Sequence, residues 1–305
     1  MASPTRKTCN RKSGRKAGGL KLDQVEFGDN LSFMAGLPDG CCQLIYADPP
    51  FFSGRTHHRR KKTLSLDDTW PGGLSSYLEF LRVRLMQMRR LLCKTGVLCL
   101  HLDWHASHHG RVLLDEIFGA DHFLNEIIWS YRTGGVAQRW LGRKHDTILV
   151  YARQVGRHKF NLLREGSFRT DGMNYDEEGR PYKSTKRGRL YFHPAGPALT
   201  DVWEIPFLST VSRERTGYPA QKPEALLARL VNSFSDPGDV VADFFAGSGT
   251  TLVVARDLGR HYLGSERSEV AYKIISQRLA ESGRKLAESG SKSRVRWRKT
   301  NTPVK

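Results

Sequence analysis

The feature that most constrains this chain is an acidic residue followed by two prolines at the end of a short apolar run. Leu44 to Ala47 has the composition of a buried strand, and Asp48-Pro49-Pro50-Phe51 follows it directly. Two consecutive prolines fix φ and remove two backbone donors, so the strand ends there and its last carbonyls lack strand partners. Open α/β sheets bind their ligands at the carboxyl ends of their strands. We therefore expect these four residues to line a ligand site on an α/β fold.

The same four residues indicate what the ligand is. An exocyclic amine on a planar base carries two hydrogens and offers a π face, and Asp48, the Pro49 carbonyl and Phe51 supply two acceptors and a platform for it. We assign the catalytic role to this set, which is Asp48, Pro49, Pro50 and Phe51. For an Asp-Pro-Pro sequence alone, a strand end followed by a rigid turn is the structural alternative.

A second motif lies near the other end of the chain, after the apolar strand Val240 to Ala242. Its sequence is Asp243-Phe244-Phe245-Ala246-Gly247-Ser248-Gly249-Thr250-Thr251, and its two glycines allow a tight strand-to-helix turn and the close approach of a ligand to the backbone. Leu252 replaces the third glycine of the dinucleotide fingerprint, and no Gly-Lys-Thr follows. The turn is therefore predicted to bind a nucleoside that has no pyrophosphate. Glu266 follows the next apolar segment, where a carboxylate can bind both hydroxyls of a ribose.

The two motifs, in this order, resemble those of DNA amino-methyltransferases that use S-adenosyl-L-methionine. The resemblance extends over residues 22 to 280 and is to the permuted (beta) class, in which Asp-Pro-Pro precedes Phe-x-Gly-x-Gly. It implies a Rossmann-like α/β fold with a mostly parallel central sheet flanked by helices, a circularly permuted motif order and an inserted target-recognition region. It also implies S-adenosyl-L-methionine as the cofactor, bound by the residues of the glycine motif, by Glu266 and by Arg267.

Three further cofactor contacts follow from the resemblance. In this class a Gly-Asp pair one strand before Asp-Pro-Pro approaches the adenine of the cofactor; here the acidic residue is Asp29, which is also a candidate helix N-cap. Lys222 lies in the segment that faces the methionine part of the cofactor, where Ala220 replaces the usual threonine. Asp48 borders the same site.

The charge of the chain favours a polyanionic partner. Lysine and arginine number 49 against 31 acidic residues, which gives a net charge of +18, so double-stranded DNA is the expected partner. The five cysteines are odd in number and lack paired metal-ligand spacing, which is typical of reduced thiols in a cytoplasmic protein, here one associated with the nucleoid. No apolar run approaches the length of a membrane span, so we expect no membrane association.

The chain divides by composition and motif into five parts. We expect a disordered basic arm over 1–19, the catalytic half over 20–156, the target-recognition region over 157–215, the cofactor-binding half over 216–280 and a basic tail over 281–305. Two stretches are candidates for DNA contact: the loop after Phe51, and the recognition region, where basic and aromatic residues alternate. The residues assigned to DNA binding are Arg55, Arg59, Arg60, Lys61, Lys183, Lys186, Arg187 and Arg189. The alternatives are a plain solvated loop and an ordinary surface insertion.

Between the two motifs, apolar periodicity predicts a helix and the next strand. One helical stripe is followed by Gly96, which is expected to end the helix, and Val97 to Leu102 is expected to be a buried strand that completes a parallel β-α-β unit. The stripe consists of Leu78, Leu81, Leu85, Met88 and Leu92. Four histidines nearby suggest zinc, but no acid or cysteine spacing supports it, and we assign no metal. They are His101, His105, His108 and His109.

Together these features predict direct methyl transfer to the exocyclic amine of a base flipped out of duplex DNA. Asp48 and the Pro49 carbonyl would help the amine to become tetrahedral, and no covalent intermediate is needed. In the class that this chain resembles, Asp before the two prolines occurs mostly in adenine-N6 enzymes, so adenine is preferred over the N4 amine of cytosine. Methylation of an RNA or protein amine and a catalytically silent DNA-binding relative are the rival hypotheses. A homodimer and a cognate restriction endonuclease are left open.

Overall fold

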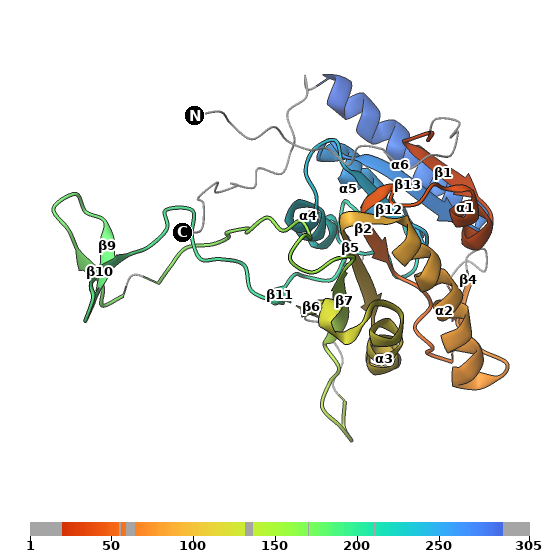
Figure 1. Cartoon of the computed structure of the whole chain (residues 1–305), viewed down its shortest axis with the longest axis horizontal. Coiled ribbons are helices and arrows are strands. Elements are labelled where there is room, and N and C mark those ends of the chain that lie inside the picture. The colour runs from red at the N-terminus through yellow and green to blue at the C-terminus, as the bar shows by residue number, and fades with distance from the viewer. Residues whose placement is uncertain are drawn as a thin grey trace.

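An eight-stranded sheet forms the centre of the molecule (Figure 1). The structure is a computed structural model that describes residues 20–54, 56–58, 65–131, 137–169, 171–209 and 211–288. Neighbouring strands are parallel except at β7, which runs against both β5 and β6, so the predicted mostly parallel sheet is confirmed. In spatial order the strands are β1 (Gln24–Phe27), β13 (His261–Glu266), β12 (Val240–Asp243), β2 (Cys42–Ala47), β5 (Leu92–Leu102), β7 (His145–Ala152), β6 (Phe123–Ser130) and β11 (Val202–Glu204).

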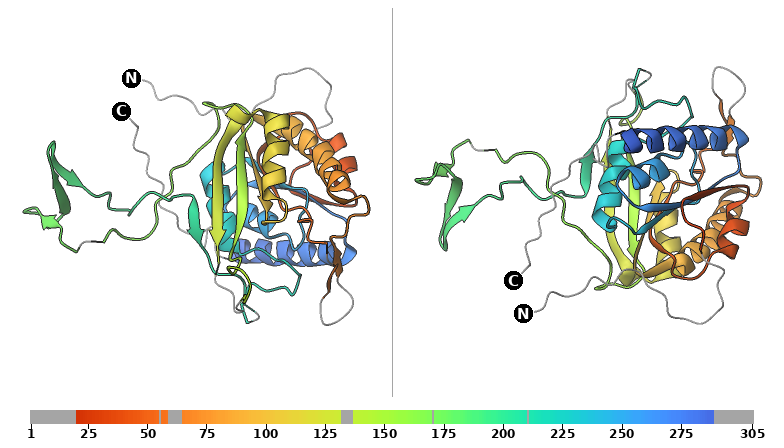
Figure 2. Two further views of the ribbon diagram at one scale, coloured as in Figure 1. Left: turned by 90° about the horizontal axis from the view of Figure 1, so that it is seen from below. Right: turned by 90° about the horizontal axis from the view of Figure 1, so that it is seen from above.

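Helices cover both faces of this sheet (Figure 2). In β2, successive side chains point to opposite faces, and Ile45 packs into one core while Tyr46 packs into the other. All six residues of β2 are buried, as expected for a central strand with helices on both sides. The face on the Ile45 side is covered by α1 (Asn30–Gly36), α2 (Gly73–Leu91) and α3 (Ser107–Phe118). A short 3-10 helix, Ala120–His122, follows α3. The face on the Tyr46 side is covered by α4 (Glu224–Phe234), α5 (Thr250–Asp257) and α6 (Glu269–Glu288). No helix within the described ranges is long and apolar enough to span a membrane.

Two element boundaries differ from the sequence-based expectation. α2 ends at Leu91 and β5 begins at the next residue, so Gly96 lies inside the strand instead of ending the helix. A Cβ at Gly96 would lie 2.9 Å from the Cys93 carbonyl oxygen and 3.1 Å from the Cys42 carbonyl oxygen, so this glycine permits a close approach of backbones. At the other end, α6 continues to Glu288, and the basic tail expected from residue 281 therefore begins within that helix.

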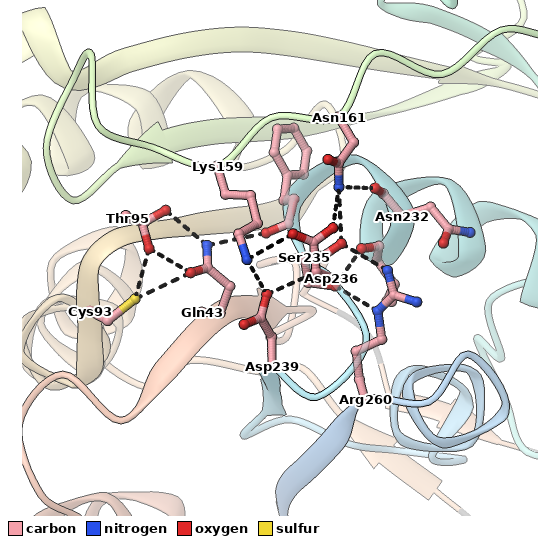
Figure 3. A network of polar contacts seen from close by, with 12 residues as sticks. Gln43, Cys93, Thr95, Lys159, Asn161, Asn232, Ser235, Asp236, Asp239 and Arg260 are labelled. Carbon is pink, nitrogen blue, oxygen red and sulfur yellow. Dashed lines mark hydrogen bonds and ion pairs between the residues drawn. The ribbon is translucent and has the colours of Figure 1, made fainter. Parts of the chain in front are cut away.

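A polar network ties the two halves of the chain together at the amino edge of the sheet (Figure 3). Gln43 Nε2 donates to the Thr95 carbonyl at 2.8 Å and to the Phe234 carbonyl at 3.2 Å, which joins β2, β5 and α4. Lys159 Nζ lies 2.6 Å from Asp239 Oδ2, directly before β12. Burial opposes the charge of Lys159, but its acidic neighbours overcome this effect and raise its pKa above the ordinary value. Gln43 and Lys159 at the amino edge therefore have partners within the protein. The candidate site lies at the opposite, carboxyl edge.

Two small antiparallel sheets lie outside the main one. β3 (Thr56–His58) pairs with β4 (Ser65–Asp67) in the segment after Phe51. A three-stranded sheet of β8 (Asn174–Tyr175), β9 (Pro181–Thr185) and β10 (Gly188–Tyr191) projects away from the body of the molecule (Figures 1 and 2). This projecting sheet belongs to the region 157–215, and every residue of β10 is exposed.

Candidate active site

The two sequence motifs meet at the carboxyl edge of the sheet, although they lie near opposite ends of the chain. β12 pairs with β2 so that Asp243 lies opposite Tyr46, two residues before Asp48. β13 pairs with the other side of β12, which brings Glu266 to the same edge. The Asp-Pro-Pro turn, the glycine turn and Glu266 therefore follow three adjacent parallel strands, the arrangement that places a ligand at the strand ends.

Asp48 has one carboxylate oxygen engaged and one free. Oδ2 lies 2.5 Å from Lys222 Nζ, and both side chains are largely buried, with 17% and 8% of their surface exposed. Oδ1 is buried and has no hydrogen-bond partner among the described residues. A buried acceptor without a donor is costly unless a ligand supplies one, so Oδ1 is a candidate contact for a substrate N–H.

The carbonyls of the two prolines have different surroundings. The Tyr77 hydroxyl, on α2, donates to the Pro50 carbonyl at 2.9 Å, whereas none of the described residues donates to the Pro49 carbonyl. Burial raises the pKa of Tyr77 far above its ordinary value, so its hydroxyl remains a donor. Among the described residues, the Pro49 carbonyl beside Asp48 thus accepts no hydrogen bond, whereas the Pro50 carbonyl accepts one from Tyr77.

Two residues that support this turn were missed in the sequence. Asp68 accepts the backbone amides of Phe52 at 3.0 Å and Ser53 at 2.6 Å, which fixes the chain directly after Phe51. Tyr77 precedes Leu81 by four residues and shares its buried helical face, so the helical period could have indicated that it points inward. No local pattern marked Asp68.

Phe51 packs against a buried polar chain. Its ring centroid lies 5.8 Å from that of His101, which is completely buried. The Tyr46 hydroxyl lies 2.7 Å from His101 Nδ1, and His101 Nε2 lies 3.2 Å from Asp146 Oδ2. A chain in which Tyr46 donates to Nδ1 and Nε2 donates to the carboxylate satisfies every group.

The carboxylate end of this chain is held ionised. The Tyr131 hydroxyl donates to Asp146 Oδ1 at 2.9 Å. Burial raises the pKa of Asp146, but its hydrogen bond to His101 and the charge of Lys222 more than offset this and hold the pKa below its ordinary value. His101 therefore has two protein partners; among the described residues, no group of three His, Cys, Asp or Glu side chains is placed to hold a metal ion.

Replacing His101 with leucine should destabilise the protein strongly. The change leaves the Tyr46 hydroxyl and Asp146 Oδ2 buried without partners, and we expect the free energy of unfolding to fall by about 2–4 kcal/mol. Urea denaturation would measure this loss. His108→Ala is the matched control because that side chain is exposed, and its effect should stay within about 0.5 kcal/mol. Equal, small effects of the two changes would contradict a buried structural role for His101.

The glycine turn closes against its neighbours so tightly that side chains are excluded. Gly247 has φ +53°, and a Cβ there would lie 3.1 Å from the Tyr218 ring; Gly249 has φ +74°, and a Cβ there would lie 2.9 Å from Ile275. The Gly247 amide donates to Glu266 Oε2 at 2.8 Å, and the Ser268 amide donates to Oε1 at 2.7 Å. Burial raises the pKa of Glu266. Each of its oxygens retains a lone pair for a further donor.

Several other members of the glycine motif support the turn from within. Asp243 accepts the Thr251 hydroxyl at 2.6 Å and the Phe245 amide at 3.0 Å. Arg278 donates to the Ser248 carbonyl at 2.8 Å and to the Thr250 hydroxyl at 2.9 Å. The side chains of Phe244 and Ala246 are buried in the two cores, and Phe245 packs against Phe80.

Asp29 is an N-cap, which was the structural alternative for this residue. Its Oδ2 accepts the Leu31 and Ser32 amides at 2.9 and 3.2 Å at the start of α1, and its Oδ1 lies 3.2 Å from Arg84. Its neighbour Gly28 donates to the Glu266 carbonyl, so the cap lies beside the end of β13.

The residues assigned to DNA contact fall into two groups. Arg55, Arg59, Arg60 and Lys61 lie outside the described residues. Lys183, Lys186, Arg187 and Arg189 are exposed on β9, β10 and the turn between them, far from the carboxyl edge in Figures 1 and 2. The structure therefore does not bring them together with Asp48.

Known proteins share both the sequence pattern and the fold. A family model described as DNA methylase, for the N6 and N4 enzymes, matches residues 42–277. A curated relative is the DNA adenine methyltransferase YhdJ of Escherichia coli K12, which is 29% identical over 286 residues that cover 92% of this chain and 90% of the relative.

Two solved structures have a similar fold. TTHA0409 from Thermus thermophilus, complexed with S-adenosyl-L-methionine, matches with a TM-score of 0.54 and 23% identity over 85% of this chain and 93% of that chain. PvuII DNA methyltransferase, described as cytosine-N4-specific, matches with a TM-score of 0.55 and 16% identity over 85% of this chain and 93% of that one. At these identities the similarity establishes the fold.

Proposed function

The chain belongs to the N6/N4 DNA methylase family, and from this premise we propose that it methylates the N6 amine of an adenine flipped out of duplex DNA. It is a DNA methyltransferase that uses S-adenosyl-L-methionine. The order of motifs supports its assignment to the permuted class, because the strand before the glycine turn comes late in the sequence yet lies between β2 and β13.

The residues at the carboxyl edge fit S-adenosyl-L-methionine. When bound, this cofactor supplies a methyl group on a positively charged sulfur. The carboxylates of Asp48, Asp243 and Glu266 lie at this edge. Burial, and to a smaller extent the charges of Asp48 and Glu266, raise the pKa of Asp243 to about 7. Lys222 offsets the charge of Asp48, and the remaining negative charge favours a cationic ligand. Glu266 would hold the ribose, the backbone of the glycine turn would border the nucleoside, Lys222 and Arg267 would face the methionine part, and Asp29 would border the adenine.

The single observation that carries the proposal is the free, buried Oδ1 of Asp48. An aromatic amine is a poor nucleophile because its lone pair is delocalised into the ring. Acceptors at Asp48 Oδ1 and the Pro49 carbonyl would hold both N–H groups and localise the lone pair on nitrogen. Asp48 Oδ1 would also be placed to accept the proton that the amine releases on methylation. Phe51 would stack on the base.

Adenine is the preferred target because Asp stands before the two prolines, and members of the resembled class with Asp at this position mostly modify adenine. The name of YhdJ agrees with this choice. Methylation of cytosine at N4 is the second candidate, since the same two acceptors fit either amine and the similar PvuII enzyme is described as cytosine-N4-specific.

DNA binding is proposed for the projecting sheet. Residues 179–200 contain no acidic residue, and the guanidinium of Arg189 lies 4.8 Å from the ring centroid of Tyr182. Exposed cations beside aromatic rings suit contact with phosphates and bases. We also assign phosphate contact to the basic residues that follow Phe51.

Lys222→Met should lower the methyl-transfer rate by about 10²-fold at saturating cofactor and DNA. The change leaves the Asp48 carboxylate buried without its counterion, so the carboxylate no longer has a fixed orientation, and breaking a buried pair in this way is costly. Single-turnover kinetics would measure the rate. Lys273→Ala is the matched control, because the Lys273–Glu269 pair is about two-thirds exposed and its loss should change the rate by less than about twofold. Equal rates for both variants would contradict a positioning role for Lys222.

Identification of the modified nucleoside tests the proposed function. The protein would be incubated with mixed-sequence duplex DNA and labelled S-adenosyl-L-methionine, and the DNA digested for mass analysis. We expect labelled N6-methyldeoxyadenosine. Label on the N4 amine of cytosine would show that the target base is cytosine and not adenine. Label found only on RNA or protein amines, in parallel incubations, would overturn the assignment of DNA as the substrate.

A further inference from the structure

A cluster of exposed aromatic and apolar side chains lies at the same sheet edge as Asp48 and has no part in the chemistry above. We call Trp104, Trp140, Leu141 and Arg143 the tryptophan cluster. Trp104 follows the carboxyl end of β5, and the other three lie in residues 137–144, directly before β7, which Figure 1 shows projecting from the sheet. β2 and β5 are parallel with Ala47 opposite Leu100, so the cluster and Asp48 follow neighbouring strand ends.

The cluster is organised but exposed. The Arg143 guanidinium lies 3.5 Å from the Trp104 ring centroid and 5.6 Å from that of Trp140. Trp140 is 61% exposed and Leu141 is 92% exposed, the largest value among the exposed large hydrophobic side chains of the described residues. Apolar groups gathered in this way, next to a ligand site, mark a surface that a partner covers.

The charge around the cluster identifies the partner as nucleic acid. Residues 137–145 contain Arg139, Arg143 and Lys144 and no acidic residue. A second copy of the chain docked symmetrically here would place these cations against themselves. A DNA duplex offers phosphates for the cations and stacked bases for the rings.

We propose that the Trp140–Leu141 tip enters the duplex beside the target base and occupies the space that the flipped base vacates. Flipping removes a stacked neighbour from the duplex, and apolar side chains inserted at such a step compensate for the lost stacking. Arg143, whose guanidinium contacts the Trp104 ring and lies near that of Trp140, orients the tip. This inference rests on the proposed function, because only an enzyme that extrudes its target base needs such a wedge.

The test compares a paired target with one that is already open. The double variant Trp140→Ala/Leu141→Ala would be assayed on a duplex carrying a site that the wild-type protein methylates, and on the same duplex with an abasic position opposite the target. We expect single-turnover methylation of the paired duplex to fall by about tenfold or more, and that of the opened duplex to stay within about twofold. Met86→Ala is the control, because Met86 is 56% exposed on the part of α2 that leads into the amino end of β5, and it should leave both rates unchanged.

Each other outcome would overturn the wedge. Equal losses on both duplexes would mean that the cluster serves general affinity or folding. If the double variant also sediments differently from the wild-type protein and loses equal activity on both duplexes, the cluster is an interface between copies of the chain. Failure to find any duplex site that the wild-type protein methylates would instead refute the proposed function, and the wedge with it.

Discussion

Asp48→Ala should lower the rate of methyl transfer by about 10³-fold while cofactor affinity changes by less than about threefold. The change removes the acceptor that is proposed to hold the amine, and the loss of one such preorganised group commonly costs about 10²–10³-fold in rate. Glu266 and the glycine turn, which are proposed to bind the cofactor, do not hydrogen-bond to Asp48 among the described residues. Single-turnover kinetics and calorimetric titration with S-adenosyl-L-methionine would measure the two quantities.

A second variant separates chemistry from folding. Asp48→Ala alone leaves Lys222 buried without its partner, which destabilises the protein. In Asp48→Ala/Lys222→Met both charges are absent, so stability should recover while the rate remains low. Recovery of the rate in the double variant, or loss of cofactor binding in the single one, would show that Asp48 is structural.

Glu266→Ala should weaken the binding of S-adenosyl-L-methionine by about 10²-fold. The carboxylate accepts the Gly247 and Ser268 amides, and the proposal gives its remaining lone pairs to the two ribose hydroxyls. Hydrogen bonds to a charged group contribute about 1.5–3 kcal/mol each, so the loss of these contacts accounts for the expected change. Calorimetry would measure the affinity, with the exposed Glu269→Ala as the control.

Deoxyribose analogues of the cofactor distinguish a ribose contact from a loosened turn. The wild-type protein should bind an analogue that lacks one ribose hydroxyl more weakly than the natural cofactor. Glu266→Ala should bind the two nearly equally. If the variant still discriminates between them as strongly as the wild-type protein, Glu266 supports the turn and does not bind the ribose.

The positions of the two motifs could be predicted from the sequence because apolar runs mark strands and prolines or glycines mark where they end. Leu44 to Ala47 and Val240 to Ala242 are such runs, and parallel strands bring their carboxyl ends to one edge. The direction of each side chain could not be predicted in this way. Asp243 and Thr251 bond to one another inside the turn, which the spacing of the motif does not reveal.

Contacts between residues that are distant in the chain could not be predicted from the sequence either. The resemblance placed Lys222 near the cofactor, but its contact with Asp48 joins residues 174 positions apart in the chain. Gly96 was wrongly expected to end α2, because a glycine that permits a close approach of backbones looks the same in a sequence as one that ends a helix. The hydrogen bonds of His101 to Tyr46 and Asp146 could not be predicted either, because the three residues lie on three separate strands.

The measurement that most directly tests the shared site is a crystal structure of the protein with duplex DNA and a non-reactive amine analogue of the cofactor. We expect the target amine to lie within hydrogen-bond distance of Asp48 Oδ1 and the Pro49 carbonyl, and the ribose hydroxyls to contact Glu266. A target base bound away from Asp48, or a cofactor bound away from the glycine turn, would contradict the assignment of donor and acceptor to this sheet edge.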